Sequence, residues 1–140
     1  MPKSIIMEQT FKVYRLEFED KPNRNSKIVR MGCYIHSDNV LEKMWWYEEM
    51  LQKHSELTQY PNISVDGFIV TNNFFCAFDS TEKLKNWFGE YFQYLIDWGL
   101  VVREYTLNAE YVTGKSGKQV MFAEHTVIDS KIILVECLVD

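Results

Sequence analysis

The chain has 140 residues, a length typical of a single domain, and we expect one domain over residues 1–140. Hydrophobic residues make up 46% of the chain, aromatic residues 15% and charged residues 25%, which excludes disordered and collagen-like proteins. The net charge of −5 disfavours binding to a phosphate backbone, so we expect no nucleic-acid partner.

The cysteines and the apolar runs near the two ends of the sequence predict a cytoplasmic protein. Cys33, Cys76 and Cys137 are far apart and have apolar neighbours, which favours reduced, buried thiols over a disulfide scaffold or a metal site. Residues 5–7 and 132–139 form apolar runs that are too short for a secretory signal or a bilayer span. We therefore expect no metal, no cofactor and no membrane contact.

The first half of the chain predicts two strands and a helix. In residues 10–19, apolar and charged residues alternate with the period of a half-buried strand, so the charged side chains are expected in water. Residues 20–27 are rich in turn formers and predict an exposed loop, after which residues 28–36 form a second strand. Gly32 inside this strand indicates a bulge or a close approach of another group. A helix is expected over residues 37–56.

The middle of the chain predicts two short strands and a longer helix. Residues 68–70 and 74–78 form apolar strands around a turn that contains two asparagines. Asp79, with Glu82 three residues later, resembles a capping box, so the helix is expected to begin there.

The apolar face of this helix repeats at spacings of three and four residues. Its members are Leu84, Trp87, Phe88, Tyr91, Leu95 and Trp98. Gly89 is a point at which the helix can divide into two shorter ones, and Gly99 is expected to end it.

The last third of the chain predicts further strands. Residues 100–107 form one strand, and the turn in residues 114–119, GKSGKQ, leads into another at 118–122. The GKSGKQ turn shares letters with a phosphate-binding loop but lacks its spacing and precedes a strand, so we expect a hairpin turn. Residues 132–139 predict the last strand, with a short helix over 126–131 as an open alternative. The fold class is therefore α+β, with a bent, mainly antiparallel sheet of about six or seven strands packed with two main helices.

Arg15 is the first candidate binding residue, because it lies in the middle of the first strand on its charged face. A guanidinium on a rigid strand can bind an anion or a phosphate through two parallel hydrogen bonds. The alternative, which the sequence favours, is a surface arginine paired with Glu17 or Glu19.

Three consecutive aromatic residues, Trp45, Trp46 and Tyr47, form the second candidate. One helix cannot bury three consecutive large side chains in a single direction. At least one of them, and Trp46 in particular, is expected to be exposed or to lie in a groove or a partner interface, where Trp and Tyr dominate the binding energy. Partial burial under a loop is the competing interpretation.

Several sequence segments, taken in order, resemble a family of small accessory proteins of tailed phages. The segments are VYRLE at 13–17, GCY at 32–34, FDSTEKLKNWF at 78–88, a glycine-led strand at 99–105 and KQVMF at 118–122. Together with the aromatic cluster, the resemblance implies a non-enzymatic phage protein. It would act in the host cytoplasm by binding a host factor, such as a defence component. Self-association into a homo-oligomer stays open.

The same order of elements also resembles the ADP-ribosyltransferase-like fold, in which strand residues line a cleft for NAD. This resemblance implies Arg15, Ser80 and Gln119 as ligand contacts, with Tyr34 stacking on a base or a ribose. Gln119 stands where that family has its catalytic glutamate, and an uncharged amide cannot stabilise an oxocarbenium-like transition state. The alternative function is therefore binding of a nucleotide or an NAD-derived ligand rather than transfer chemistry.

Overall fold

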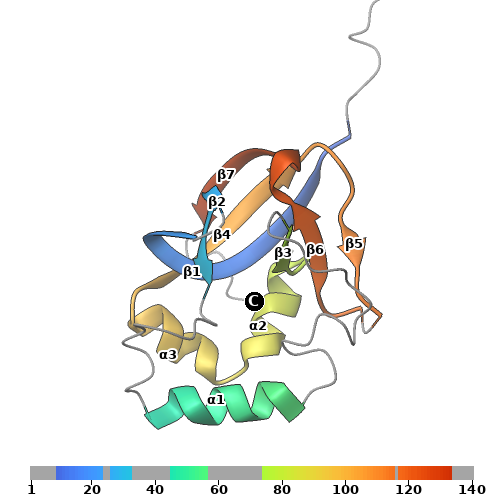
Figure 1. Ribbon diagram of the computed structural model, residues 1–140. Coiled ribbons are helices and arrows are strands. Elements are labelled where there is room, and N and C mark those ends of the chain that lie inside the picture. Colours follow the sequence, from blue (N-terminus) through green and yellow to red (C-terminus); the bar gives the residue numbers. More distant parts are fainter. Residues whose placement is uncertain (1–8, 24–25, 33–44, 57–73, 116, 134–140) are drawn as a thin grey trace, which may run out of the picture.

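The computed structural model describes residues 9–23, 26–32, 45–56, 74–115 and 117–133, which form seven strands and three α-helices (Figure 1). All strand pairs are antiparallel. The predicted α+β class is confirmed.

The larger sheet has four strands in the order β2-β1-β4-β7. Its members are β1 (Phe11–Asn23), β2 (Ser26–Gly32), β4 (Leu100–Leu107) and β7 (Val127–Ile133). The longest pairing joins β1 to β4 without interruption, from Phe11 opposite Leu107 to Phe18 opposite Leu100.

The smaller sheet has three strands in the order β3-β6-β5. Its members are β3 (Phe74–Ala77), β5 (Val112–Thr113) and β6 (Val120–Ala123), and the turn between β5 and β6 is the predicted hairpin. A backbone bridge joins the two sheets, because Tyr14 of β1 and Phe78, just after β3, exchange N–H···O bonds of 2.7 and 2.9 Å. β1 is therefore linked to the smaller sheet by this bridge, and it bends along its length (Figure 1).

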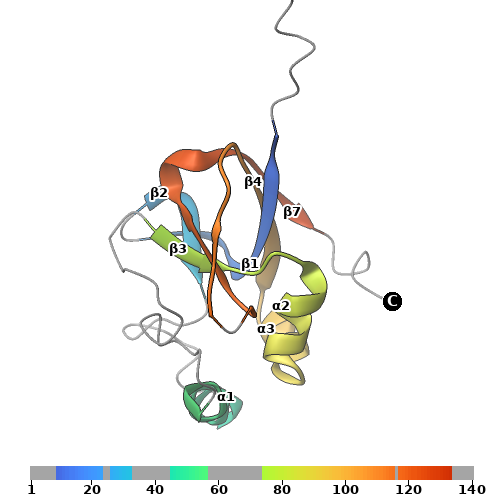
Figure 2. The same cartoon turned by 90° about the vertical axis from the view of Figure 1, so that its right-hand side faces the viewer.

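The helices lie together at one end of the two sheets in both views (Figures 1 and 2). They are α1 (Trp45–Glu56), α2 (Thr81–Phe88) and α3 (Tyr91–Asp97). Gly89 ends α2 with a φ of +55° and donates its N–H to the Lys85 carbonyl, so the division predicted at this glycine is confirmed. A side chain is strained at that φ, which is why glycine suits the position.

Two apolar clusters stabilise the fold, one on each face of the larger sheet. Side chains alternate between the two faces along β1. Leu16 and Phe18 therefore pack in the cluster with the helices, and Val13 packs in the cluster with the smaller sheet. Along β4, Val102 joins the helical cluster and Tyr105 joins the inter-sheet cluster. The larger sheet is therefore covered on both faces.

Two predictions about element boundaries are wrong. β1 continues to Asn23 and β2 begins at Ser26, so most of the loop predicted over residues 20–27 is strand. The register shifts on both sides of Pro22, a residue that cannot donate a ladder hydrogen bond. Near the C-terminus, β7 begins at Val127 rather than at residue 132. Residues 126–131 do not form the alternative helix, because this segment pairs with the edge of β4. A single 3-10 turn (Glu124–Thr126) precedes β7.

Two predictions about the helices also need correction. The N-cap of α2 is Ser80, whose hydroxyl accepts from the Lys83 N–H at 3.1 Å, one residue later than the predicted Asp79 cap. In α1 the exposed aromatic residue is Trp45, at 71% exposure, whereas Trp46, expected outside, is 6% exposed. The helix turns Trp46 inward because its ring stacks on Tyr94 of α3, with 5.4 Å between ring centroids.

Several predicted features fall outside the described residues. These are the strand at 68–70 and the turn after it, residues 33–36 of the second strand, residues 37–44 of the first helix, and residues 134–139 of the last strand. Cys33, Cys137 and Tyr34 lie there too. Cys76 is described, and it is half-buried rather than fully buried.

The opposite placements of Trp45 and Trp46 predict opposite costs of removal. Trp46→Ala should lower the free energy of unfolding by about 3–5 kcal/mol, because it leaves a cavity between α1 and α3. Trp45→Ala should cost less than about 1 kcal/mol, because the ring is mostly in water. Urea unfolding of the two variants measures both values, and equal costs would contradict the inward placement of Trp46.

Candidate functional site

A polar cluster lies between the two sheets, formed by Arg15 and Glu17 on β1 and by Arg103 and Tyr105 on β4. Side chains alternate along a strand, so these four share the face that carries Val13 and Leu107, which the smaller sheet covers. The Glu17 side chain is 0% exposed. The charged face of the first strand, expected in water, is thus buried at Glu17 and largely covered at Arg15, whereas Glu19 is exposed.

The Glu17 carboxylate binds two guanidinium groups and a phenol. Arg15 Nε donates to Oε2 at 2.9 Å, and Arg103 Nε donates to Oε1 at 2.7 Å. The Tyr105 hydroxyl donates to Oε1 at 2.7 Å. Arg15 and Arg103 stand directly opposite each other in the β1–β4 register, so the carboxylate between them offsets part of the repulsion of this like-charge pair.

Arg15 makes two further hydrogen bonds within the protein. Nη1 donates to the Cys76 carbonyl at 2.6 Å and Nη2 to the Arg30 carbonyl at 3.3 Å. A Cβ on Gly32 would lie 3.1 Å from Nη2, so the close approach predicted at this glycine is confirmed. Arg15 therefore pairs with Glu17, as the sequence favoured, but inside the molecule rather than on its surface.

The structure brings together two of the predicted ligand residues. Arg15 and Gln119 line a cavity of about 60 Å³, next to Cys76 and Phe78. This space corresponds to about two water molecules at roughly 30 Å³ each. Ser80 is not among the residues that line it, and its hydroxyl caps α2.

Burial controls the ionisation of two tyrosines on this sheet. The pKa of Tyr105 is raised far above its ordinary value, first by burial and then by the adjacent Glu17 carboxylate. The pKa of Tyr14 is raised by burial and by Glu104. Both phenols are therefore neutral hydrogen-bond donors at neutral pH.

An aromatic patch, defined here as Trp45, Tyr94 and Trp98, lies on the outer side of α1 and α3. Trp45 meets Tyr94 edge to face, with 6.0 Å between ring centroids. Tyr94 is 37% exposed and Trp98, the C-cap of α3, is 39% exposed. The two are neighbours because they are four residues apart along helical backbone. Of the three predicted partner residues, Trp45 lies on this surface, whereas Trp46 and Tyr47 are buried beneath it.

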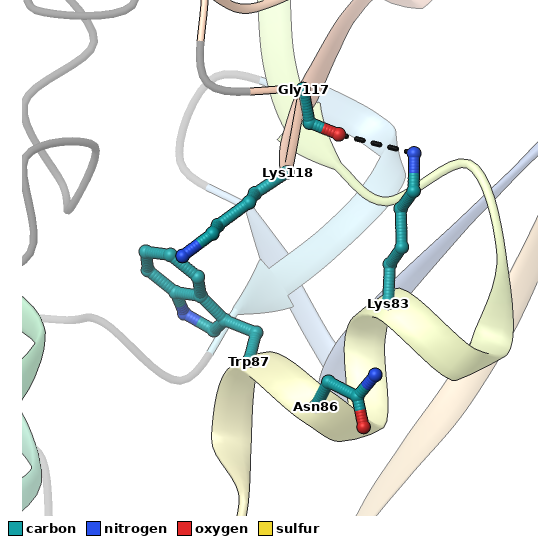
Figure 3. A pocket seen from close by; sticks show the side chains of 5 residues that line it. All are labelled: Lys83, Asn86, Trp87, Gly117 and Lys118. Carbon is teal, nitrogen blue, oxygen red and sulfur yellow. Dashed lines mark hydrogen bonds between the residues drawn. The ribbon is translucent and has the colours of Figure 1, made fainter.

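A second surface feature, the lysine pocket, has a volume of about 360 Å³ and is lined by Lys83, Asn86, Trp87, Gly117 and Lys118 (Figure 3). Lys83, Asn86 and Trp87 come from α2, and Gly117 and Lys118 come from the hairpin before β6. Lys83 Nζ donates to the Gly117 carbonyl at 3.1 Å, which joins the two walls.

Sequence reasoning did not find this pocket. Trp87 was assigned to the apolar helix face, and the GKSGKQ turn was correctly expected to be a hairpin. The available signal was the spacing of Lys83, Asn86 and Trp87 by three and four residues, which places all three on one side of a helix. Its meaning depends on the hairpin that faces them.

Comparison with known proteins identifies one relationship. The sequence profile of the family described as Bacteriophage T4 Y00F protein matches residues 7–135. Searches of curated proteins and of solved structures found no match. Within the described residues, no helix is long and apolar enough to cross a membrane. In the same part of the chain, no group of three or more His, Cys, Asp or Glu side chains could hold a metal ion.

The Glu17 carboxylate predicts a large effect of a single substitution. Glu17→Leu should lower the free energy of unfolding by about 3–5 kcal/mol, because it leaves Arg15 and Arg103 facing each other without a counter-ion. Glu19→Gln, an exposed position on the same strand, should change it by less than about 0.5 kcal/mol. Denaturant unfolding compares the two, and a Glu17→Leu variant as stable as Glu19→Gln would refute the role of the carboxylate.

The raised pKa of Tyr105 predicts a loss of stability in alkali. Above pH 10 the unfolded chain releases the phenol proton while the folded chain keeps it, so the free energy of unfolding falls as pH rises. This tyrosine contributes a slope of up to about 1.4 kcal/mol per pH unit. Tyr105→Phe should be less stable at pH 7 but should show a shallower decline above pH 10, measured by urea unfolding at several pH values. Parallel curves for the two proteins would contradict the burial of the neutral phenol.

Proposed function

The chain belongs to the bacteriophage T4 Y00F protein family, and we propose that it acts in the host cytoplasm as a non-enzymatic accessory protein that binds a host protein, such as a defence component. The observation that carries this proposal is the aromatic patch on α1 and α3. Trp45 is mostly exposed there and Tyr94 and Trp98 are each more than one-third exposed, although the neighbouring Trp46 and Tyr47 are buried.

The patch is held in place before any partner arrives. Tyr94 contacts the buried Trp46 on one side and the exposed Trp45 on the other, at 5.4 and 6.0 Å between ring centroids. Below them the Tyr91 hydroxyl donates to the Glu49 carboxylate, which fixes α1 against α3. A rigid surface loses less conformational entropy on association. Trp and Tyr in such positions are the residues that most often dominate binding energy.

The charges around the patch indicate the chemistry of the partner. Glu49, Glu90 and Asp97 are exposed, and each lies within about one helical turn of a patch residue. α3 itself, YFQYLID, contains no basic residue. A partner with an apolar centre and a basic rim would match this surface, and the net charge of −5 would speed its approach.

The alternative, a nucleotide or NAD-derived ligand at Arg15, Tyr34, Ser80 and Gln119, has less support. The Arg15 donors already bind Glu17 and two backbone carbonyls, and the cavity it shares with Gln119 is about 60 Å³. Small-molecule sites are typically about 300–1,000 Å³.

The test first captures a partner by crosslinking and then measures its affinity for the protein. A photo-reactive phenylalanine analogue replaces Asp97 at the rim, and the host protein crosslinked to it in extract is identified and purified. Its dissociation constant is then measured against the parent chain and two variants. Trp45→Ala should weaken binding by about 30-fold, the size of a hot-spot residue. Val112→Ala, which removes an exposed apolar side chain on β5, should leave the affinity within about twofold.

Two outcomes would overturn this proposal. The purified host protein could bind the parent and Trp45→Ala equally well, which would separate binding from the patch. Alternatively, the parent could self-associate in sedimentation experiments while Trp45→Ala is monomeric and no purified host protein binds. The patch would then serve a second copy of this chain.

A further inference from the structure

The lysine pocket has the dimensions of a small-molecule site. Its volume of about 360 Å³ lies within the range of about 300–1,000 Å³ typical of such sites. One wall is Trp87, which is only 8% exposed and packs against Phe78 with 6.0 Å between ring centroids. The indole is therefore a fixed surface, because the core behind it holds the ring.

The pocket brings two ammonium groups together in an acidic protein. They belong to Lys83 and Lys118, and Lys83 Nζ forms an ion pair with Asp79 at 3.1 Å. The Asp79 carboxylate and the Gly117 carbonyl orient the Lys83 ammonium, which has three donors. Asp79 contacts this ammonium through both carboxylate oxygens, Oδ1 at 3.1 Å and Oδ2 at 3.3 Å, so an anion that enters the pocket would share or displace those contacts.

The second ammonium approaches from the opposite wall. In Figure 3 the Lys118 side chain extends from the hairpin toward the Trp87 indole. A lysine is a point charge on a flexible stem, so it can turn from the ring to an anion that enters the pocket. Such a movement would uncover the indole face for a flat group.

Asn86 completes the set of polar groups. Its amide is exposed and has no hydrogen-bond partner among the described residues. An amide can both donate and accept a hydrogen bond, as the edge of a heterocyclic ring does.

From these contacts we propose that the lysine pocket binds a small anionic ligand with a flat ring, of the nucleoside monophosphate class. Lys83 and Lys118 hold the phosphate through charge-assisted hydrogen bonds. The ring lies against Trp87, since bases of every kind stack on aromatic side chains. Asn86 bonds the edge of the ring. This site is separate from the aromatic patch and from the Arg15 cavity, so it stands whether or not the patch binds a host protein.

The experiment titrates the full chain with AMP, adenosine and inorganic phosphate, and follows the indole N–H resonances by NMR. Trp87→Phe and Trp45→Phe assign the two relevant signals. AMP should move the Trp87 resonance saturably and leave that of Trp45 in place, and it should bind at least about tenfold more tightly than adenosine or phosphate alone.

Matched variants test the site by charge and by position. Lys118→Gln should weaken AMP binding by about tenfold or more, whereas Lys115→Gln, an exposed lysine in the same hairpin that does not line the pocket, should stay within about twofold. Asn86→Ala, which changes no charge, should weaken the binding of AMP more than the binding of phosphate. The thermal unfolding midpoint of each variant confirms that it is folded, and Trp45→Ala should bind AMP as the parent does.

Three outcomes would overturn the proposal. AMP could leave the Trp87 resonance unmoved at millimolar concentration. Inorganic phosphate could bind as tightly as AMP, which would mean that the ring contributes nothing to binding. Lys115→Gln could weaken AMP as much as Lys118→Gln, which would reduce the effect to the general charge of the hairpin.

Discussion

The burial of Glu17 between Arg15 and Arg103 is the constraint on which the rest of the fold depends. The two arginines are forced opposite each other by the uninterrupted β1–β4 register. The face they share can be covered by a second sheet only if a counter-ion lies between them and hydrogen-bond acceptors meet the guanidinium groups. Glu17, Tyr105 and the backbone carbonyls of Cys76 and Arg30 meet that requirement. The polar cluster is thus part of the joint between the sheets.

The sequence predicts most of the local structure, and it fails where tertiary contacts decide. β4, the hairpin and the break at Gly89 follow from patterns within a few residues. Alternation in the first strand correctly separates two faces, but it cannot tell a face in water from a face under a second sheet, and so Glu17 was expected outside. The rotation of α1 was missed for a similar reason, because the stacking of Trp46 on Tyr94 joins residues far apart in sequence.

The candidate surfaces were predictable to different degrees. Three consecutive aromatics had to leave one side chain exposed, so the presence of an aromatic surface followed from sequence, although the exposed member is Trp45. The sequence does not indicate the lysine pocket in this way. One wall is a side of α2 and the other is a hairpin, and the two meet only in the folded chain. The two surfaces differ in charge, with acidic residues around the patch and two lysines in the pocket. Each therefore suits a different kind of ligand.

The position of β1 between the two apolar clusters has a consequence for the way in which the molecule opens. β1 pairs with β2 and β4 and is bridged to Phe78 beside β3, and it supplies side chains to both apolar clusters. Detaching either sheet exposes part of the cluster that the other needs. Partial unfolding of one sheet alone is therefore costly, and the backbone amides along the centre of β1 should exchange with solvent only when the whole domain opens.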